Sequence, residues 1–242
     1  MKTAVIIPAR YASTRLEGKP LLKVKGMPII QHVYLKAKQS SADVVIVATD
    51  DERIKTAVEE FGGICEMTSV DCQSGSDRIA TVAKRHDDFE YIVNLQGDEP
   101  QIKPEAIDLV IKSLKSSPEI DISTLIREIE DKEQIENPNC VKCVVDNNFN
   151  AMYFSRCPIP YPRNPKSAKY YAHIGIYGYK RSSLLKMCAM DKTDLENQES
   201  LEQLRALQNG MKIKTSVVDF NPIGIDTKED YEKFKKICEG CC

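Results

Sequence analysis

The chain has 242 residues, a length typical of one or two domains and long enough to bury a sizeable core without disulfides or metals. Its 29% charged and 42% apolar residues exclude long disorder, and 34 Lys and Arg against 36 Asp and Glu exclude an overall basic surface for nucleic acid. The longest apolar runs, residues 4–7 and 44–48, are far shorter than the ~20 residues of a membrane span. The N-terminus has no secretory pattern, so we expect a cytoplasmic protein without membrane or nucleic-acid partners.

The first half of the chain alternates between predicted strands and helices. Apolar, β-branched runs predict strands at residues 3–7, 44–48 and 91–95. Apolar residues that recur every three or four positions predict helices at residues 28–39, 51–61, 76–85 and 104–114, the second of them capped by Asp50. This order predicts an α/β fold with a mostly parallel, right-handed sheet.

The second half is less regular. Its predicted strands are at residues 141–145, 152–155, 172–179 and 213–218. Turn residues between the first two predict a hairpin, and four prolines in residues 158–165 predict an extended connection. Capping-box spacing of Thr193 with Glu196 predicts a helix to about residue 208, and Thr227 with Asp230 begins a last helix. We expect one domain, residues 1–242, with an inserted, less regular subregion.

The nine cysteines are expected to be free thiols. An odd number fits a reducing compartment better than a disulfide scaffold. Cys140 and Cys143 have the spacing of zinc ligands, but their segment is predicted to be a strand, in which residues three apart face opposite sides. We therefore favour buried or idle thiols over a metal site.

A cationic loop follows the first predicted strand. Arg10, Arg15 and Lys19 lie within ten residues, at the strand end where open α/β sheets bind ligands. Arginine forks and a flexible ammonium suit a triphosphate. The loop is not a Walker A motif, because Pro20 rather than Ser or Thr follows Lys19. From the residues alone, a phosphate site and a solvated basic loop both remain open.

Two aspartates follow predicted strands. Asp98 lies behind Gly97 after a buried strand, and Asp226 lies at a second strand–helix junction. Magnesium usually takes one or two carboxylates and completes its shell with phosphates and water, so the pair suggests a magnesium site. Both segments are equally suitable as turns, and the periodicity does not establish that the two carboxylates meet.

Longer motifs occur along the chain. They are IIPARYASTRLEGKP at 6–20, VATD at 47–50, SGSDR at 74–78, NLQGDEP at 94–100, YFSR at 153–156, HIGIYGY at 173–179, LEQLR at 201–205 and GIDT at 224–227. In this order they resemble the CMP-Kdo synthetases (3-deoxy-manno-octulosonate cytidylyltransferases) over nearly the whole chain. The resemblance implies a Rossmann-like fold similar to glycosyltransferase-A nucleotidyltransferases and a homodimer formed through residues 150–190.

The resemblance also implies an activity, the Mg²⁺-dependent transfer of CMP from CTP to the anomeric hydroxyl of Kdo, for lipopolysaccharide biosynthesis. Lys19, Arg10, Arg15 and Asp98 would be catalytic, the three cations neutralising phosphates and Lys19 stabilising the departing pyrophosphate. Asp98 and Asp226 would hold the metal. The residues expected to bind CTP are Ala9, Arg10, Arg15, Lys19, Ser74, Gly75, Arg78 and Gln96.

On the acceptor side, the resemblance implies that Arg156 pairs with the sugar carboxylate and that His173, Glu202 and Gln203 bind its hydroxyls. By composition alone, a structural arginine, a packed histidine and a solvated helix face are the simpler interpretations. Activation of 8-amino-Kdo or of a sialic acid remains an alternative, and a non-catalytic nucleotide-binding module is a remote one.

The chain departs from the family pattern at three positions. Glu17 replaces a common proline and places a negative charge in the phosphate loop. Ala172 replaces a common basic residue before His173, and Lys228 replaces a proline after the GIDT motif. None of these removes a predicted metal ligand or phosphate-binding cation.

Overall fold

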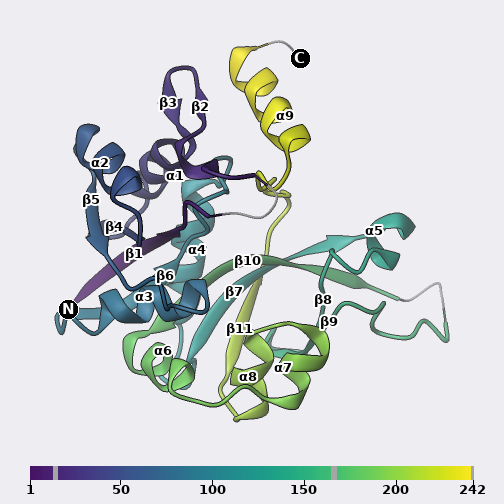
Figure 1. Ribbon diagram of the computed structural model, residues 1–242. Coiled ribbons are helices and arrows are strands. Elements are labelled where there is room, and N and C mark those ends of the chain that lie inside the picture. Colours follow the sequence, from purple (N-terminus) through teal and green to yellow (C-terminus); the bar gives the residue numbers. More distant parts are fainter. Residues whose placement is uncertain (13–15, 165–167, 241–242) are drawn as a thin grey trace. The chain divides into compact units, whose positions relative to one another are not determined.

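The computed structural model describes residues 1–12, 16–164 and 168–240 (Figure 1). Packing divides the chain into two compact units. Unit 1 comprises Met1–Asp108 and the segment that begins at Pro222, and unit 2 comprises Leu109–Asn221. The expectation of a single domain over residues 1–242 is not tested by this division and stays a prediction.

Unit 1 contains four parallel strands. They are β1 (Lys2–Ala9), β4 (Val44–Thr49), β5 (Ile64–Met67) and β6 (Phe89–Asn94). Their order is β6-β1-β4-β5, which gives β1 a neighbour on each side, with Ile6 opposite both Ile46 and Asn94. Residues 4–7 are fully buried, as expected of an inner strand that is apolar on both faces. The predicted α/β fold with a parallel sheet is confirmed, although β5 was not predicted because its four residues lack an apolar run.

The helices of unit 1 follow the predicted apolar stripes. They are α1 (Ile29–Lys38), α2 (Glu52–Glu60), α3 (Gly75–Ala83) and α9 (Lys228–Glu239), while α4 (Pro104–Leu114) crosses the sequence boundary between the units. A 3₁₀ helix, η1 (Lys19–Leu21), and the short strands β2 (Lys23–Val24) and β3 (Met27–Pro28) precede α1. The predicted capping box of Thr227 and Asp230 is present at the start of α9.

The predicted cap of α2 was wrong by one residue. Asp51, not Asp50, accepts the hydrogen bond from the backbone N–H of Arg53, at 2.9 Å. Asp50 instead binds the guanidinium of Arg78, with 2.7 Å between Nη2 and Oδ2. Either aspartate could cap a helix. Because Asp50 binds the buried Arg78, Asp51 is the one that caps α2.

Unit 2 contains a mixed set of strands. They are β7 (Ile122–Ile129), β8 (Lys142–Val145), β9 (Ala151–Ser155), β10 (Tyr170–Lys180) and β11 (Ile213–Val217). β7 pairs antiparallel with β10 and parallel with β11, while β8 pairs antiparallel with both β10 and β9 (Figure 1). The predicted β8–β9 hairpin is confirmed, and residues 158–164 form no strand or helix, as the prolines predict. Pro165 lies outside the described residues. β7, a central strand, was not predicted.

The predicted helix from Thr193 to about residue 208 is two helices. Unit 2 has α5 (Lys132–Glu136), α6 (Arg181–Cys188), α7 (Asp194–Glu199) and α8 (Gln203–Gln208). Ser200, with φ 52°, ends α7 in the left-handed region. Among the described residues, no helix has the length and apolar character needed to cross a membrane.

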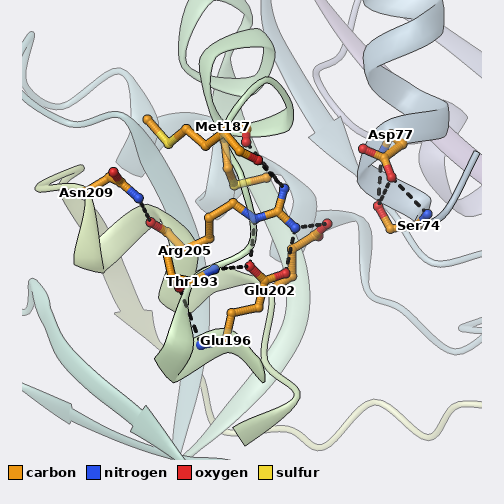
Figure 2. Close-up of polar contacts among 9 residues, drawn as sticks. Ser74, Asp77, Met187, Thr193, Glu196, Glu202, Arg205 and Asn209 are labelled. Atoms are coloured by element: carbon orange, nitrogen blue, oxygen red, sulfur yellow. Dashed lines mark hydrogen bonds and ion pairs between the residues drawn. The ribbon is translucent and has the colours of Figure 1, made fainter. Parts of the chain in front are cut away.

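A buried ion pair explains this break. Arg205 donates to both carboxylate oxygens of Glu196, at 2.7 and 2.6 Å, and also to the carbonyls of Met187 and Met190 (Figure 2). Nine residues of continuous helix would separate Glu196 and Arg205 by about 13 Å along the axis, so the turn at Ser200 is needed to bring them together.

We expect Arg205→Ala to destabilise the protein by about 3–5 kcal/mol, because it leaves the Glu196 carboxylate buried without its partner. Urea unfolding measures the change. The double variant Glu196→Leu with Arg205→Met should recover most of the loss, and Lys132→Ala, on an exposed pair, should change stability by less than about 0.5 kcal/mol. A single variant as stable as the wild type would show that the pair does not hold the two helices.

Candidate functional site

The carboxyl ends of β1 and β6 form a polar hollow in unit 1. Its volume is about 360 Å³, and its lining consists of Pro8, Ala9, Arg10, Ala12, Lys19, Pro20, Gly75, Gln96, Gly97, Asp98 and Asp226. Seven residues of the predicted nucleotide and metal sites therefore lie together: Ala9, Arg10, Lys19, Gly75, Gln96, Asp98 and Asp226. Arg15, also predicted to bind phosphate, lies outside the described residues.

Lys19 is the centre of this hollow. Its Nζ lies 2.6 Å from Oδ2 of Asp98 and 3.3 Å from Oδ1 of Asp226. Gly18 sets the direction of the side chain, because its left-handed φ of 65° turns the chain into η1. A further bond fixes Asp226, since the neighbouring Ile225 N–H donates to the Asp98 carbonyl at 2.8 Å. The two aspartates, which the sequence alone could not bring together, thus converge on one cation.

The two carboxylates suit a hard divalent cation. Both face the hollow, and the side chain of Asp226 is half exposed, so water and phosphate oxygens have access to the space between them. Within the described part of the chain, no cluster of three or more His, Cys, Asp or Glu side chains has metal-binding geometry. A metal held by Asp98 and Asp226 would complete its shell with oxygens of substrate and water, the pattern that magnesium favours.

Glu99 is a third carboxyl beside Asp98 and Asp226, and it was not predicted as a site residue. Burial, with the charges of Asp98 and Asp226 beside it, raises the pKa of Glu99 to about 8. Its Oε2 is buried and has no hydrogen-bond partner among the residues that the structure describes. In the free protein, Asp98 and Asp226 thus carry most of the negative charge at this edge, and Lys19 and Arg10 carry the positive charge.

Glycine at position 97 allows the hollow to form. A Cβ on Gly97 would lie 2.8 Å from the Pro8 carbonyl oxygen, closer than side chains approach a backbone oxygen. Only glycine therefore lets the end of β6 pass so near the end of β1. Arg10 also lines the hollow, and its Nη2 donates to the Cys72 carbonyl at 2.6 Å.

Two of the residues predicted to bind CTP, Arg78 and Ser74, make hydrogen bonds to other residues of the protein. Arg78 is fully buried, with Nη1 bound to Thr68 and Nη2 bound to Asp50, so the guanidinium joins α3 to the ends of β4 and β5. The Ser74 hydroxyl accepts the Asp77 N–H in a capping box at the start of α3 (Figure 2). Neither side chain lines the hollow. Their structural contacts do not exclude a role with the nucleotide, which stays a prediction.

The acceptor candidates belong to unit 2. The guanidinium of Arg156 donates to three backbone carbonyls, those of Pro138, Glu199 and Ser200, and its N–H donates to the Glu199 carboxylate. All three acceptors of the guanidinium are neutral, so its charge remains available to an anion. Arg156 thus fixes the turn between α7 and α8, directly before Glu202 and Gln203.

Glu202 and Gln203 begin α8. Glu202 Oε1 lies 3.9 Å from Arg205 Nη2, the same nitrogen that binds Glu196 (Figure 2). Gln203 is buried, and its Nε2 has no hydrogen-bond partner among the described residues. An amide donor without a partner is costly when buried, which is consistent with a ligand group at this position.

His173 lies on β10. Its Nε2 is 3.0 Å from Thr124 Oγ1, and the Thr124 hydroxyl donates to the carbonyl of Ile176. The hydroxyl oxygen must therefore accept from Nε2–H, which leaves Nδ1 as an acceptor. Burial lowers the pKa of His173 to about 3, so the imidazole is neutral.

His173 lines a cavity whose described lining includes none of the other acceptor candidates. The cavity has a volume of about 340 Å³, and the other residues that line it are Arg127, Gln134, Asn137, Asn139, Cys140, Ala172 and Asn221. Tyr177, which was not predicted as a site residue, lies near both His173 and Glu202. Its ring centroid is 5.2 Å from that of His173, and burial together with the charge of Glu202 raises the pKa of Tyr177.

Open α/β sheets bind their ligands at the carboxyl ends of the strands, and a cationic loop with two convergent carboxylates at that edge suits a nucleotide-dependent transferase. Residues 4–213 match the family model described as cytidylyltransferase, and the chain belongs to this family.

Known proteins are similar to this chain over nearly its full length. A 3-deoxy-manno-octulosonate cytidylyltransferase of Fusobacterium nucleatum is 49% identical, with 96% of this chain and 95% of the relative covered. An 8-amino-3,8-dideoxy-manno-octulosonate cytidylyltransferase of Shewanella halifaxensis is 46% identical, with 99% and 98% covered. The solved structure of a CMP:2-keto-3-deoxy-manno-octonic acid synthetase complexed with CTP has a TM-score of 0.96, 41% identity and full coverage of both chains. The Rossmann-like nucleotidyltransferase fold implied by the motifs is confirmed.

Gly97→Ala should destabilise the protein by about 1–3 kcal/mol, because the added methyl group forces the ends of β1 and β6 apart. CTP binding should weaken with it, since both strand ends line the hollow. Urea unfolding and CTP calorimetry measure the two effects, with Gly175→Ala as the stability control because a Cβ there meets open space. Equal stability of Gly97→Ala and wild type would contradict this close approach.

Acid should destabilise the protein partly through His173. The histidine has its usual pKa of 6.5 when unfolded and about 3 when folded, so below pH 6.5 the unfolded chain binds a proton that the folded chain does not. The contribution is lost as pH falls from 6.5 towards 3, with a slope of at most about 1.4 kcal/mol per pH unit. Urea unfolding of His173→Gln between pH 6.5 and 4.5 should show a shallower decline than wild type, and parallel profiles would contradict the burial of a neutral imidazole.

Proposed function

We propose that this chain transfers CMP from CTP to the anomeric hydroxyl of Kdo, releasing pyrophosphate and forming CMP-Kdo for lipopolysaccharide biosynthesis. The observation that carries the proposal is the contact of Lys19 with both Asp98 and Asp226 inside the hollow of unit 1. The 49% identity to a relative named 3-deoxy-manno-octulosonate cytidylyltransferase supports the choice of acceptor.

The CTP site mainly has to compensate the negative charge of the phosphates. Arg10 and Lys19 neutralise the phosphates, and Lys19 stabilises the negative charge that develops on the departing pyrophosphate. Arg15 is assigned to the same phosphates. The backbone of Ala9 and Arg10, with Ser74, Gly75, Arg78 and Gln96, surrounds the cytidine. A protein nucleophile is unnecessary, because the acceptor hydroxyl attacks the α-phosphorus in line with the leaving pyrophosphate.

Magnesium is the proposed cofactor, and Asp98 and Asp226 would hold it. When bound, the ion supplies positive charge to the α-phosphate oxygens. Burial raises the pKa of the neighbouring Glu99 carboxyl to about 8 in the free protein, so Asp98 and Asp226 are the better candidates to hold the ion.

The acceptor is recognised in unit 2. The guanidinium of Arg156, whose partners among the described residues are neutral carbonyls, pairs with the sugar carboxylate. His173, Glu202 and Gln203 bind hydroxyl groups of the sugar, and the unpartnered Nε2 of Gln203 supports its part in this. The 8-amino analogue of Kdo is the second candidate acceptor, because a relative named for that sugar is 46% identical.

Two further properties belong to this proposal. We infer a homodimer formed through residues 150–190, where Met152 and Tyr161 expose most of their apolar surface. We also infer a cytoplasmic location, which the seven free cysteines among the described residues favour. Light scattering in solution tests the first inference, with twice the chain mass as the expected result.

The function is tested by pyrophosphate release with CTP and Mg²⁺ in the presence of Kdo, 8-amino-Kdo or a sialic acid. Release with Kdo is the expected result. Release with 8-amino-Kdo or a sialic acid but not with Kdo would support the transfer of CMP and show that the acceptor is a different sugar. CTP binding without release for all three would instead favour a non-catalytic nucleotide-binding module.

Asp98→Asn should lower turnover by about 100-fold or more, because the amide keeps the shape of the side chain but removes a charge from the metal site. Circular dichroism should show the fold intact. The control is Asp88→Asn, which removes a carboxylate from an exposed pair with Lys2. Unchanged turnover of Asp98→Asn, at any Mg²⁺ concentration, would refute the metal assignment.

A further inference from the structure

The base of the phosphate loop is closed between Tyr11 and Gly18. The backbone N–H of Gly18 donates to the Tyr11 carbonyl at 3.0 Å. The Tyr11 ring lies against the same glycine, since a Cβ built on Gly18 would be 3.1 Å from Cζ of the ring. Arg10 directly precedes Tyr11, and Lys19 directly follows Gly18, so the closed base lies between the two cations that face the hollow.

Arg53 joins this base to α2. The carbon at the centre of its guanidinium lies 3.3 Å from the centroid of the Tyr11 ring, well within the distance of a cation–π contact. The guanidinium is itself fixed, because Nε and Nη2 donate to the two carboxylate oxygens of Asp51 at 2.9 and 2.6 Å. Asp51 caps α2, so the stack of Gly18, Tyr11 and Arg53 ends on a rigid helix start.

The groups around Arg53 stabilise its positive charge. The hydrogen bonds that Arg53 donates to Asp51 raise the pKa of Arg53, and the nearby Tyr11 and Glu17 act in the same direction. Glu17 is the acidic residue that replaces the proline common in the family. Its negative charge therefore lies near a cation of α2, which offsets part of its repulsion toward phosphates.

We propose that Tyr11 and Arg53 are positioning residues for CTP, which fix the separation of Arg10 and Lys19 by stacking the base of the phosphate loop on the start of α2. Neither residue touches the reacting atoms in this account. They act by presenting the two cations already spaced for a triphosphate, so that less ordering is required when the nucleotide binds. The inference rests on the proposed function, because it assumes that the hollow binds CTP.

The test is CTP affinity, measured by calorimetry with Mg²⁺ and without acceptor, together with KM for CTP and thermal stability. Arg53→Ala and Tyr11→Leu should each weaken CTP binding about two- to fivefold, the size of an exposed cation–π contact. KM for CTP should rise by the same factor while kcat stays within about twofold, since binding is affected and the chemical step is not. Tyr11→Phe keeps the ring and should bind CTP like the wild type.

Two controls separate positioning from a merely structural role. The double variant Tyr11→Leu with Arg53→Ala should lose no more affinity than one single variant, because both remove the same stack. Arg85→Ala removes another exposed arginine of unit 1 that pairs with a carboxylate, that of Glu66, and should leave CTP binding unchanged.

Each outcome decides the inference. Unaltered CTP affinity in Arg53→Ala and Tyr11→Leu, with a wild type that binds CTP, would overturn the inference and leave the proposed function intact. Additive losses in the double variant would also overturn it. A wild type that binds no CTP would overturn the proposed function, and this inference with it.

Discussion

The contact of one ammonium with two carboxylates is the constraint on which the site depends. Lys19 lies 79 residues from Asp98 and 207 from Asp226, yet its Nζ contacts both. Parallel pairing of β1 with β6 brings Lys19 and Asp98 to the same sheet edge, and the backbone bond from Ile225 to Asp98 adds the third member. Two carboxylates and two cations, Lys19 and Arg10, then line the hollow, an arrangement that suits a divalent cation together with the phosphates that the cation carries.

Two arginines of the family motifs have structural partners inside the fold. Arg78 is buried against Thr68 and Asp50, and Arg205 is buried against Glu196. Both link elements whose ends carry candidate site residues, α3 in unit 1 and α8 in unit 2. A motif position can therefore be required for the position of its neighbours, and residue type alone does not separate this role from direct binding.

The sequence predicted the parts of the fold that depend on local pattern. Apolar stripes located α1, α2 and α4, and capping spacing located α7 and α9, since these signals lie within a few residues. The parts it missed depend on distant partners: β5 is defined by pairing with β4, and the break at Ser200 by the Arg205–Glu196 contact. In the site, the composition suggested Lys19, Asp98 and Asp226 separately, but their convergence, and the raised pKa of Glu99, required the folded chain.

The roles proposed for Lys19, Asp98 and Asp226 require Lys19 to exchange its contacts with the aspartates for contacts with phosphate when CTP and the metal bind. The most direct measurement is a crystal structure of the protein with CTP and Mg²⁺. The account predicts density for the ion between Asp98 and Asp226, with Lys19 Nζ moved onto a phosphate oxygen. A structure in which CTP is bound while Lys19 remains within hydrogen-bond distance of Asp98, as it is at 2.6 Å in the free protein, and in which no ion lies between the aspartates, would contradict it.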